Sequence, residues 1–489
     1  MTVYLVGAGP GDPGLMTVRA MELIAAADVI IHDRLIPAGA LAVARPDAEL
    51  IDVGKRGGGE SAQQDEINRL LAEHGAKLVV RLKGGDPFLF GRGGEEAETL
   101  AQAGIPFEVV PGVTAGIAAP AYAGIPVTHR DLASAVAFVT GHEDPAKDES
   151  VLDWDALAAF PGTLVIYMGV ARLDSIVKRL IAAGREPGEP ATVVERGTLP
   201  DQRVLEGTLA TLSELGARAP AIVLIGPVAG LREVAAWFER RPLAGVSVAV
   251  TRAREQASGL AARLRSMGAK VVEAPAIRIV PRQFRLPELS GFDLVCFTSP
   301  NGVRILFDEL SQQGLDARAL AGVTVAAIGP GTASALRERG VIADVVPERF
   351  VAEGLIDALA GRNVSRALVA RAAAARDVLP DALRDRGAEV DVLALYDTEA
   401  EPLTEEQRQQ VGQADYVTFT SSSTVNFLVQ ALGDGGTLAR TRLISIGPVT
   451  SQTLRDQGLD PQVEARQHDI EGLVAALLED ATAQRRQSG

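Results

Sequence analysis

Short apolar runs alternate with helix-like segments along almost the whole chain. Glycine, hydroxyl-bearing or charged residues follow the runs, as in VYLVGAG (3–9), LVVRLKGGD (78–86), DLVCFTS (293–299) and DYVTFTS (415–421). Strand-length runs separated by helical patterns predict α/β domains with largely parallel sheets. In such domains the loops that follow the strands bind ligands. We therefore look for chemistry at the ends of the apolar runs.

The pattern restarts near residue 243. A charged helix end meets Pro242 within WFERRPLAGVSVAV (237–250), and a new strand then begins. A chain of 489 residues is too long for one core, so we expect one domain over residues 1–240 and another over 243–489.

The second domain contains an internal repeat. FTSPNGVRILFDEL (297–310) resembles FTSSSTVNFLVQAL (419–432), and AIGPGTASALRERG (327–340) resembles SIGPVTSQTLRDQG (445–458). The same pair of strand–loop–helix units thus occurs twice, in the same order. This arrangement predicts two similar lobes that face each other across a ligand cleft.

Composition excludes several classes of function. The net charge of −15 and an aromatic content of 4% disfavour nucleic acid as a partner. The single cysteine, Cys296, stands in an apolar run and is interpreted as a buried structural thiol; the five histidines lack metal-ligand spacing. We expect no metal site. With no leader pattern and no apolar stretch of about eighteen residues, we expect a soluble cytoplasmic protein with no membrane contact.

The first glycine-rich loop, YLVGAGPGDPGLMT (4–17), matches the dinucleotide-binding pattern G-x-G-x-x-G, with Asp33 about twenty residues further on. Pro10 and Pro13 have no N–H for a phosphate, however, and Asp12 adds a negative charge. A second loop, RLKGGDPFLFGRGGEE (81–96), is again acidic and poor in donors. Both loops suit a positively charged ligand such as S-adenosylmethionine. Sharp turns without a ligand, and a dinucleotide-dependent oxidoreductase, remain as alternatives.

These loops belong to a longer series of motifs. VGAGPGDPGLMT, ADVIIHDRLI, VGKR, VVRLKGGDPFLFGRGGEE, VPGVTAGIAAPAYAGIPVTHRD, FVTGH and LVIYMGV resemble uroporphyrinogen-III C-methyltransferases in order and spacing over about residues 1–240. The resemblance implies a two-lobed α/β fold, a homodimer, and S-adenosylmethionine bound between the lobes. The cofactor contacts that it implies fall on Pro10, Gly84, Gly85, Asp86, Leu89, Thr114, Ala115, Met168 and Gly197.

The resemblance also implies an acid/base pair, Asp33 of HDRL and Lys55 of VGKR. Because the substrate carries eight carboxylates, cations of these motifs are candidates to face it: Lys55, Arg56, Arg81, Lys83, Arg92 and Arg130. A helix cap or turn for Asp33 and a solvated surface cation for Lys55 are the alternatives. One departure from the family's pattern is Gly116, where serine or alanine is expected.

Residues 243–489 resemble uroporphyrinogen-III synthases in FTSPNGV, AIGPGTASAL, VLALYDT, FTSSSTV and SIGPVTSQTL. This resemblance implies two α/β lobes joined by two connecting strands: residues 243–280 with 398–489, and residues 281–396. Hydroxyls at strand ends are the candidate ligands of a linear bilane: Thr298, Ser299, Thr420, Ser421, Ser422 and Thr450. Tyr396 of LYDT is the candidate for chemistry. Plain helix caps and a core tyrosine are the alternatives.

The two resemblances describe consecutive reactions. They imply a synthase (lyase) that cyclises hydroxymethylbilane to uroporphyrinogen III with inversion of ring D, and a methyltransferase that methylates this product at C2 and C7 to give precorrin-2. A non-catalytic, tetrapyrrole-binding second half and a later precorrin methylase are the rival interpretations. The sequence leaves open whether the product serves sirohaem or cobalamin biosynthesis.

Overall fold

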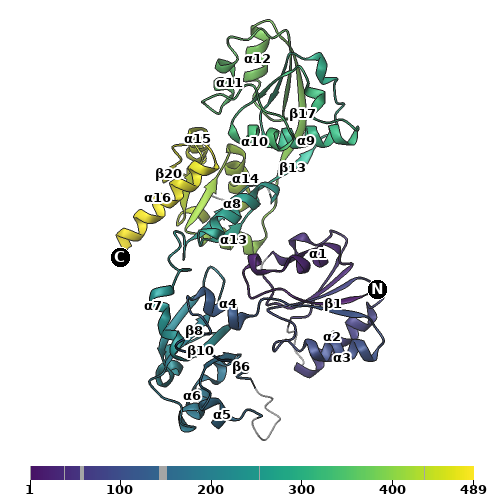
Figure 1. The fold of residues 1–489 in the computed structure, drawn as a ribbon. Helices are drawn as coiled ribbons and strands as arrows, with labels where there is room; N and C mark the ends of the chain where they lie inside the picture. Colours follow the sequence, from purple (N-terminus) through teal and green to yellow (C-terminus); the bar gives the residue numbers. More distant parts are fainter. Residues whose placement is uncertain are drawn as a thin grey trace. The chain divides into compact units, whose positions relative to one another are not determined.

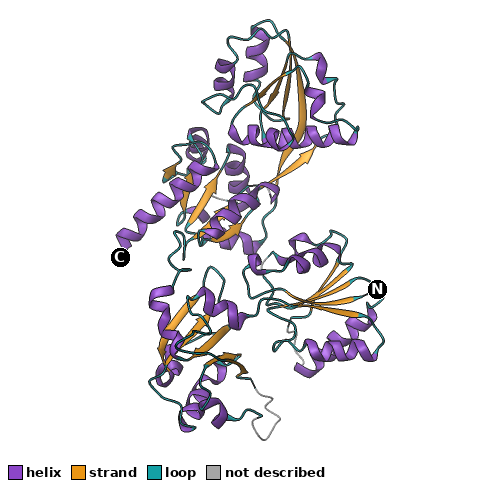
Figure 2. Cartoon of the chain, viewed as in Figure 1, coloured by secondary structure: helices purple, strands orange, loops and turns teal. Residues whose placement is uncertain are grey.

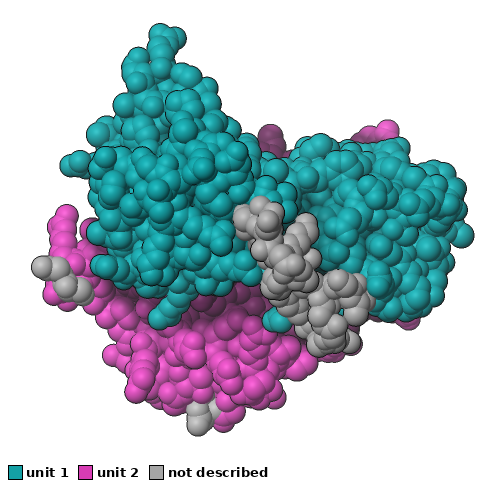
Figure 3. Space-filling model, turned by 90° about the horizontal axis from the view of Figure 1, so that it is seen from below, with its two compact units in different colours: residues 1–241 teal, residues 242–489 magenta. Residues whose placement is uncertain are grey.

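The chain forms two compact units, Met1–Arg241 and Pro242–Gly489, which are coloured separately in Figure 3. The computed structural model describes residues 2–37, 39–54, 60–142, 151–252, 254–433 and 436–488. Lys55 and Arg56 lie outside the described residues. Among the described residues, no helix combines the length and the apolarity needed to cross a membrane.

Unit 1 begins with a parallel five-stranded sheet whose order is β3-β2-β4-β1-β5. Its strands are β1 (Val3–Gly7), β2 (Val29–His32), β3 (Glu49–Asp52), β4 (Val79–Lys83) and β5 (Phe107–Val110). The helices α1 (Val18–Ala26), α2 (Glu60–Glu73) and α3 (Gly93–Gln102) cover it. α1 packs on one face and the other two on the opposite face, because the central strands are apolar on both sides (Figure 1, Figure 2). We call this part, residues 2–113, the first lobe of unit 1.

The second lobe of unit 1, residues 115–241, holds a mixed sheet of order β6-β7-β10-β8-β9. Its strands are β6 (Val136–Thr140), β7 (Thr163–Tyr167), β8 (Pro190–Glu195), β9 (Arg203–Thr208) and β10 (Ala221–Ile225). The helices are α4 (Ala115–Tyr122), α5 (Trp154–Ala158), α6 (Leu173–Ala182) and α7 (Arg232–Ala235). Among the described strands of this lobe, β6 and β7 alone pair in parallel. The expectation of largely parallel sheets is wrong here, because β8 and β9 form a hairpin with no crossover helix between them.

Unit 2 contains two further sheets. The first, of order β12-β11-β18-β19-β20, is parallel and comprises β11 (Ser247–Val250), β12 (Lys270–Glu273), β18 (Tyr416–Phe419), β19 (Arg442–Ser445) and β20 (Val463–Glu464). The helices around it are α8 (Arg254–Ser266), α13 (Glu405–Gly412), α14 (Ser422–Leu432), α15 (Pro448–Asp456) and α16 (Ile470–Ser488). Two separate stretches of the chain thus build this part, which we call lobe one.

The other sheet of unit 2 has the order β13-β17-β16-β14-β15 and forms lobe two. Its strands are β13 (Ile277–Pro281), β14 (Leu294–Phe297), β15 (Thr324–Ala327), β16 (Arg366–Ala372) and β17 (Glu389–Ala400). The helices are α9 (Pro300–Gln312), α10 (Pro330–Glu338), α11 (Ala352–Ala358) and α12 (Val378–Asp385). β13 and the end of the long β17 run antiparallel and carry the chain between the lobes (Figure 1). The sequence repeat maps onto β14–α9 and β15–α10 in lobe two, and onto β18–α14 and β19–α15 in lobe one.

Candidate functional sites

Glycines allow three loops to approach one another closely at the carboxyl edge of the first sheet in unit 1. The loops after β1 and β4 exchange two backbone hydrogen bonds, from the Gly9 N–H to the Gly85 carbonyl (3.2 Å) and from the Gly85 N–H to the Gly9 carbonyl (2.7 Å). A Cβ atom at Gly112, after β5, would lie 2.2 Å from the Gly85 carbonyl oxygen. The Gly85 φ of +71° also favours glycine. The glycine pattern therefore creates a close junction of backbones where ligands of α/β sheets bind.

The carboxylates of the two acidic loops are held by donors of the protein. Asp86 accepts hydrogen bonds from the N–H groups of Phe88 (2.8 Å) and Gly112 (3.0 Å). Asp12 accepts from the Gly14 N–H (2.8 Å) and from the Tyr122 hydroxyl (2.8 Å). Both side chains therefore fix the shapes of their loops, a role that the sequence interpretation did not include.

Backbone strain occurs in the loop after β4 and in two loops of the second lobe, after β7 and β8. Among the described residues, the non-glycine positions with positive φ are Phe90 (54°), Arg92 (57°), Met168 (54°), Arg196 (47°) and Thr198 (73°), all in unit 1. They adjoin or include the predicted cofactor positions Leu89, Met168 and Gly197. A left-handed backbone costs about 1–3 kcal/mol for a residue other than glycine, and such strain concentrates at functional sites. Three loops of unit 1 thus combine backbone strain with predicted cofactor positions.

Tyr167, the last residue of β7, connects several of the predicted positions. Its hydroxyl lies 2.6 Å from the Thr114 hydroxyl and accepts the Gly116 N–H at 2.6 Å. Its ring lies 5.0 Å from that of Phe90, measured between centroids. Burial raises the pKa of Tyr167, so its hydroxyl stays protonated. Gly116 is explained as well: a Cβ there would lie 2.3 Å from the Tyr167 hydroxyl oxygen.

Asp33 follows β2 and lies beside a buried cluster of charges. Arg81 donates from one terminal nitrogen to Asp33 (2.7 Å) and from Nε to Glu96 (3.1 Å), and Lys83 donates to the same Glu96 oxygen (2.7 Å). The side chains of Arg81, Glu96 and Lys83 are only 2%, 0% and 4% exposed, whereas that of Asp33 is 33% exposed. Burial, followed by the neighbouring Arg81, lowers the pKa of Lys83. Only the carboxylate of Asp33 in this cluster is open to a ligand.

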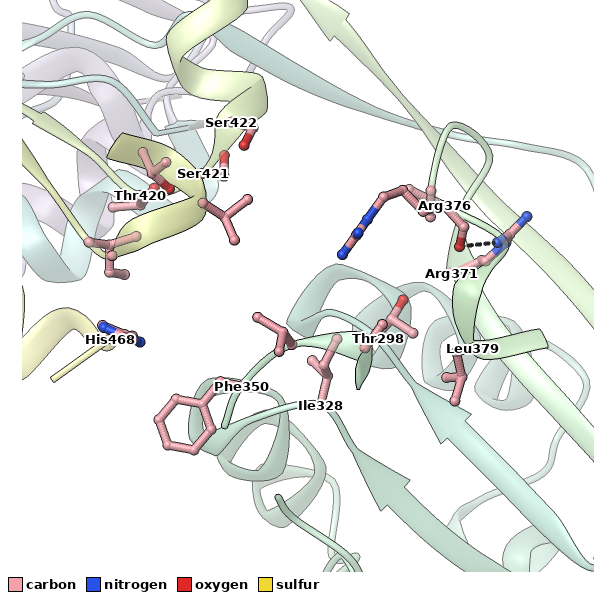
Figure 4. A pocket seen from close by; sticks show the side chains of 18 of the residues that line it. Thr298, Ile328, Phe350, Arg371, Arg376, Leu379, Thr420, Ser421, Ser422 and His468 are labelled. Atoms are coloured by element: carbon pink, nitrogen blue, oxygen red, sulfur yellow. Dashed lines mark hydrogen bonds between the residues drawn. The ribbon is translucent and has the colours of Figure 1, made fainter. Parts of the chain in front are cut away.

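In unit 2 the two lobes enclose a cavity of about 440 Å³ (Figure 4). Five of the predicted hydroxyl residues line it, as does the predicted Tyr396: Thr298, Thr420, Ser421, Ser422 and Thr450. Ser299 lies behind this wall, where its hydroxyl is 2.8 Å from the Tyr396 hydroxyl. Tyr396 is 5% exposed, and burial raises its pKa.

Helices begin at the cavity in pairs related by the repeat. Ser299 caps α9 by accepting the Gly302 N–H (3.0 Å), and Ser421 caps α14 by accepting the Thr424 N–H (3.3 Å). The residues just before α10 and at the start of α15 line the same cavity. Helix N-termini carry positive dipole ends, so the starts of these helices favour anions, although α9, α10 and α15 begin with a proline that has no N–H group. Ser299 and Ser421 do act as helix caps, and a helix N-terminus that is capped in this way can still attract an anion.

Two arginines complete the cavity from lobe two. Arg376 extends between the lobes toward Ser421 and Ser422 in Figure 4 and also pairs with Glu353 (3.1 Å). Arg371, 8% exposed, donates to the Arg376 carbonyl (2.9 Å) and to Asp377 (2.7 Å). The cavity is therefore cationic on one wall and rich in hydroxyls on the other.

Comparison with known proteins identifies both halves. Residues 2–213 match the family model of "Tetrapyrrole (Corrin/Porphyrin) Methylases" and residues 258–475 that of "Uroporphyrinogen-III synthase HemD". The "Porphyrin biosynthesis protein HemD" of Ruminiclostridium josui is 40% identical over 494 residues, which cover 98% of this chain and 97% of that protein. The chain belongs to this family of methylase–synthase fusions. It is thus a two-domain enzyme of tetrapyrrole biosynthesis.

Other relatives match the methylase half alone. The "S-adenosyl-L-methionine-dependent uroporphyrinogen III methyltransferase" of Methanosarcina barkeri is 53% identical over 47% of this chain and 93% of that protein. A solved uroporphyrin-III C-methyltransferase of Thermus thermophilus, complexed with S-adenosyl homocysteine, is 43% identical over 47% of this chain and 93% of its own (TM-score 0.41).

In the methylase half, the structure distributes the predicted cofactor positions over neighbouring loops. Pro10 follows β1, Gly84 to Leu89 follow β4, Thr114 and Ala115 begin α4, Met168 follows β7 and Gly197 follows β8. Their binding role stays a prediction. The expectation that Arg81 and Lys83 face the substrate is wrong, because both are buried against Glu96. Arg92 is paired with Glu95 on the surface, and Arg130 is exposed.

In the methylase and synthase halves the sequence interpretation missed several residues. Tyr167 stands within LVIYMGV and Tyr122 within VPGVTAGIAAPAYAGIPVTHRD, and this membership of a motif was the signal for them. Arg371, Arg376 and His468 line the cavity of the synthase half. They stand outside the repeated segments, so the repeat could not point to them.

Proposed function

We propose that the synthase half cyclises hydroxymethylbilane to uroporphyrinogen III with inversion of ring D, and that the methylase half methylates this product at C2 and C7 with S-adenosylmethionine to give precorrin-2. The observation that carries the proposal is the presence of both complete halves in one chain, matched end to end by one relative. The product of the first reaction is the substrate of the second. The fusion raises the local concentration of the intermediate.

The two glycine-rich loops of the methylase half support S-adenosylmethionine as the methyl donor. Pro10, Pro13 and Pro87 carry no N–H group, and a Cβ at Gly85 would meet nothing within 4 Å. The loops therefore offer open backbone with few donors, which fits a cationic ligand better than a phosphate. The bound cofactor would supply an activated methyl group. The protein's part is to hold the reacting atoms in line and to exclude water.

Asp33 is the proposed base of the methylation. Its carboxylate is one-third exposed, and Arg81 holds one of its oxygens at 2.7 Å, which leaves the other oxygen to accept a proton from the macrocycle. Lys55, in the segment outside the described residues, is the proposed acid. Arg56 and the exposed Arg130 are proposed to bind substrate carboxylates.

The cavity of the synthase half supports a substrate with many carboxylates. The N-terminal dipole ends of α14 and α15 and the guanidinium of Arg376 offer positive potential, while Thr298 and Ser422 offer hydroxyl groups. We propose that Tyr396 acts near the hydroxyl that leaves the bilane, because its own hydroxyl is held by Ser299 in the cavity wall. Conformational control of the reactive intermediate is the main task of this site.

We further propose that the protein forms a homodimer through its methylase half and acts in the cytoplasm. Sedimentation equilibrium of the full chain measures its mass in solution. A mass of twice 51.2 kDa is expected, and a monomer at micromolar concentration would overturn the proposal.

One anaerobic assay tests both activities. The purified chain receives hydroxymethylbilane and methyl-labelled S-adenosylmethionine, and chromatography resolves the products by isomer type and by methyl count. Dimethylated type III product above the spontaneous type I background is the expected result. Methylation only of added uroporphyrinogen III would instead favour the alternative of a non-catalytic second half. Asp33→Asn and Tyr396→Phe serve as matched variants, each expected to impair one activity alone.

A further inference from the structure

Asp12 joins the two lobes of unit 1. It lies in the first glycine-rich loop of the first lobe, and two of its hydrogen bonds are made with residues of the second lobe. Its carboxylate accepts the Tyr122 hydroxyl at 2.8 Å, and its N–H donates to the Thr198 hydroxyl at 3.1 Å. A Cβ at the neighbouring Gly11 would lie 3.0 Å from the Leu199 side chain, so the loops are closely packed there. We call Asp12, Tyr122 and Thr198 the latch.

The last residues of unit 1 hold one partner of Asp12 by packing. The rings of Trp237 and Phe238 lie 5.1 Å and 4.9 Å from the ring of Tyr122, and the Trp237 indole donates to the Ala121 carbonyl at 2.9 Å. The Arg241 guanidinium lies 3.7 Å from the centre of the Phe238 ring. Burial and the Asp12 carboxylate raise the pKa of Tyr122, with Arg241 opposing, so its hydroxyl remains a donor.

The same segment holds the other partner through hydrogen bonds. The N–H of Thr198, which has a strained φ of 73°, donates to the Gln202 side chain at 2.9 Å. Gln202 in turn donates to Glu239 at 3.0 Å, and Arg232 pairs with the same Glu239 oxygen at 3.2 Å. Residues 237–241, at the junction with unit 2, thus fix both Tyr122 and Thr198.

Hydrogen bonds connect the latch to the glycine-rich loops. Asp12 shares a loop with Gly9, which exchanges two hydrogen bonds with Gly85, and the adjoining Asp86 accepts the Gly112 N–H. A displacement of Asp12 would therefore disturb all three loops at the carboxyl edge of the sheet. Neither Tyr122 nor Trp237 belongs to the predicted cofactor contacts.

We propose that Tyr122 is a positioning residue for the cofactor loops, and that the junction segment 237–241 keeps it in place, so that affinity for the methyl donor depends on how the chain leaves the methylase half. The proposal rests on the proposed methylation. It predicts a change in ligand affinity and in loop protection, whereas the chemical step, once the ligand is bound, changes little.

Full-length variants test the proposal with S-adenosylhomocysteine as the probe, titrated by calorimetry. Tyr122→Phe removes the hydroxyl donor to a carboxylate and is expected to raise the Kd about tenfold. Its kcat at saturating donor should fall less than threefold. Tyr4→Phe, in β1 beside Arg19, is the matched control and should bind like the wild type. Trp237→Ala should also raise the Kd, while Trp154→Ala, which removes the other tryptophan of the chain, should not.

Two further measurements separate positioning from a general loss of structure. In a double-mutant cycle, Asp12→Ala and Tyr122→Phe should be non-additive, because the tyrosine acts through that carboxylate. Hydrogen exchange without ligand should rise at the amides of residues 14–16 in Tyr122→Phe, while the cyclisation rate stays unchanged. An unchanged Kd and unchanged exchange in Tyr122→Phe, or full additivity, would overturn the latch alone. Failure of the wild type to bind the probe would overturn both this proposal and the proposed methylation.

Discussion

Gly116→Ala tests the contact between α4 and Tyr167. The added methyl group would lie 2.3 Å from the hydroxyl oxygen and 2.7 Å from two ring carbons of Tyr167. The ring therefore has to move by about 1 Å to reach an ordinary contact distance. It cannot do so and keep both of its 2.6 Å hydrogen bonds, to Thr114 and to the N–H of residue 116. Phe90 and Phe138 restrict its movement from other sides.

The size of the effect follows from three contributions. Two hydrogen bonds are worth about 1 kcal/mol each, and overpacking adds about 1–3 kcal/mol. Alanine in place of glycine in a helix returns up to about 1 kcal/mol. The net loss is about 2–4 kcal/mol in the free energy of unfolding of the methylase half. Weaker binding of S-adenosylhomocysteine is expected as well, because Tyr167 adjoins Met168 and Thr114.

Urea unfolding followed by circular dichroism measures the loss, with cyclisation activity as a reference for the synthase half. Gly94→Ala is the control, because a Cβ at this helical glycine meets nothing within 4 Å, and it should be neutral or slightly stabilising. In a Tyr167→Ala background the alanine at residue 116 should no longer destabilise. A Gly116→Ala protein at least as stable as the wild type would refute the reasoning.

Three other changes give separate outcomes. Tyr396→Phe should slow cyclisation but reduce the unfolding free energy by only about 1–2 kcal/mol, the worth of its hydrogen bonds to Ser299 and Asn301; an unchanged rate would make it a packing residue. Glu96→Gln removes the carboxylate that the buried Lys83 pairs with and leaves Arg81 paired with Asp33 alone, so it should reduce the free energy of unfolding in urea by about 3–5 kcal/mol. Burial raises the pKa of the Cys296 thiol to about 12, whereas the thiol of the unfolded chain ionises at about pH 8.5. The free energy of unfolding should therefore fall as the pH rises above about 8.5, by about 2 kcal/mol at pH 10. Cys296→Ala should lack this component when unfolding is compared at pH 8 and 10.

The alternation of apolar runs with helical patterns was enough to predict the α/β class. Strands that are buried on both faces consist almost entirely of apolar residues, as in VYLVG and LVCF. Strand direction was not readable in the second lobe of unit 1, because an apolar run looks the same in parallel and antiparallel sheets. The partner of Asp12 was equally inaccessible, because Tyr122 lies 110 residues further along the chain.

Arg81 and Lys83 were misread for a different reason. Their charge suggested an anionic ligand, yet they stand in VVRLK, where every residue of the strand is buried. A charged residue inside such a run predicts an internal counter-ion, and Glu96 supplies it. In the synthase half, the repeat identified the hydroxyls that both lobes share. Arg371 and Arg376 belong to one lobe only, so symmetry carried no information about them.

Lobe one is built from two separate stretches of the chain, and this affects folding during synthesis. Ser247, the first residue of β11, bonds to Asp415, just before β18, across 168 residues, and all of lobe two is synthesised in between. At about 5–20 residues per second, β11 waits roughly 10 to 30 s on the ribosome for its neighbour. Lobe two is continuous in sequence and has its own core, so it can complete its fold during that interval. The edge of β11 that later pairs with β18 stays open meanwhile, so the nascent chain is exposed to wrong strand pairing until residues 416–419 emerge.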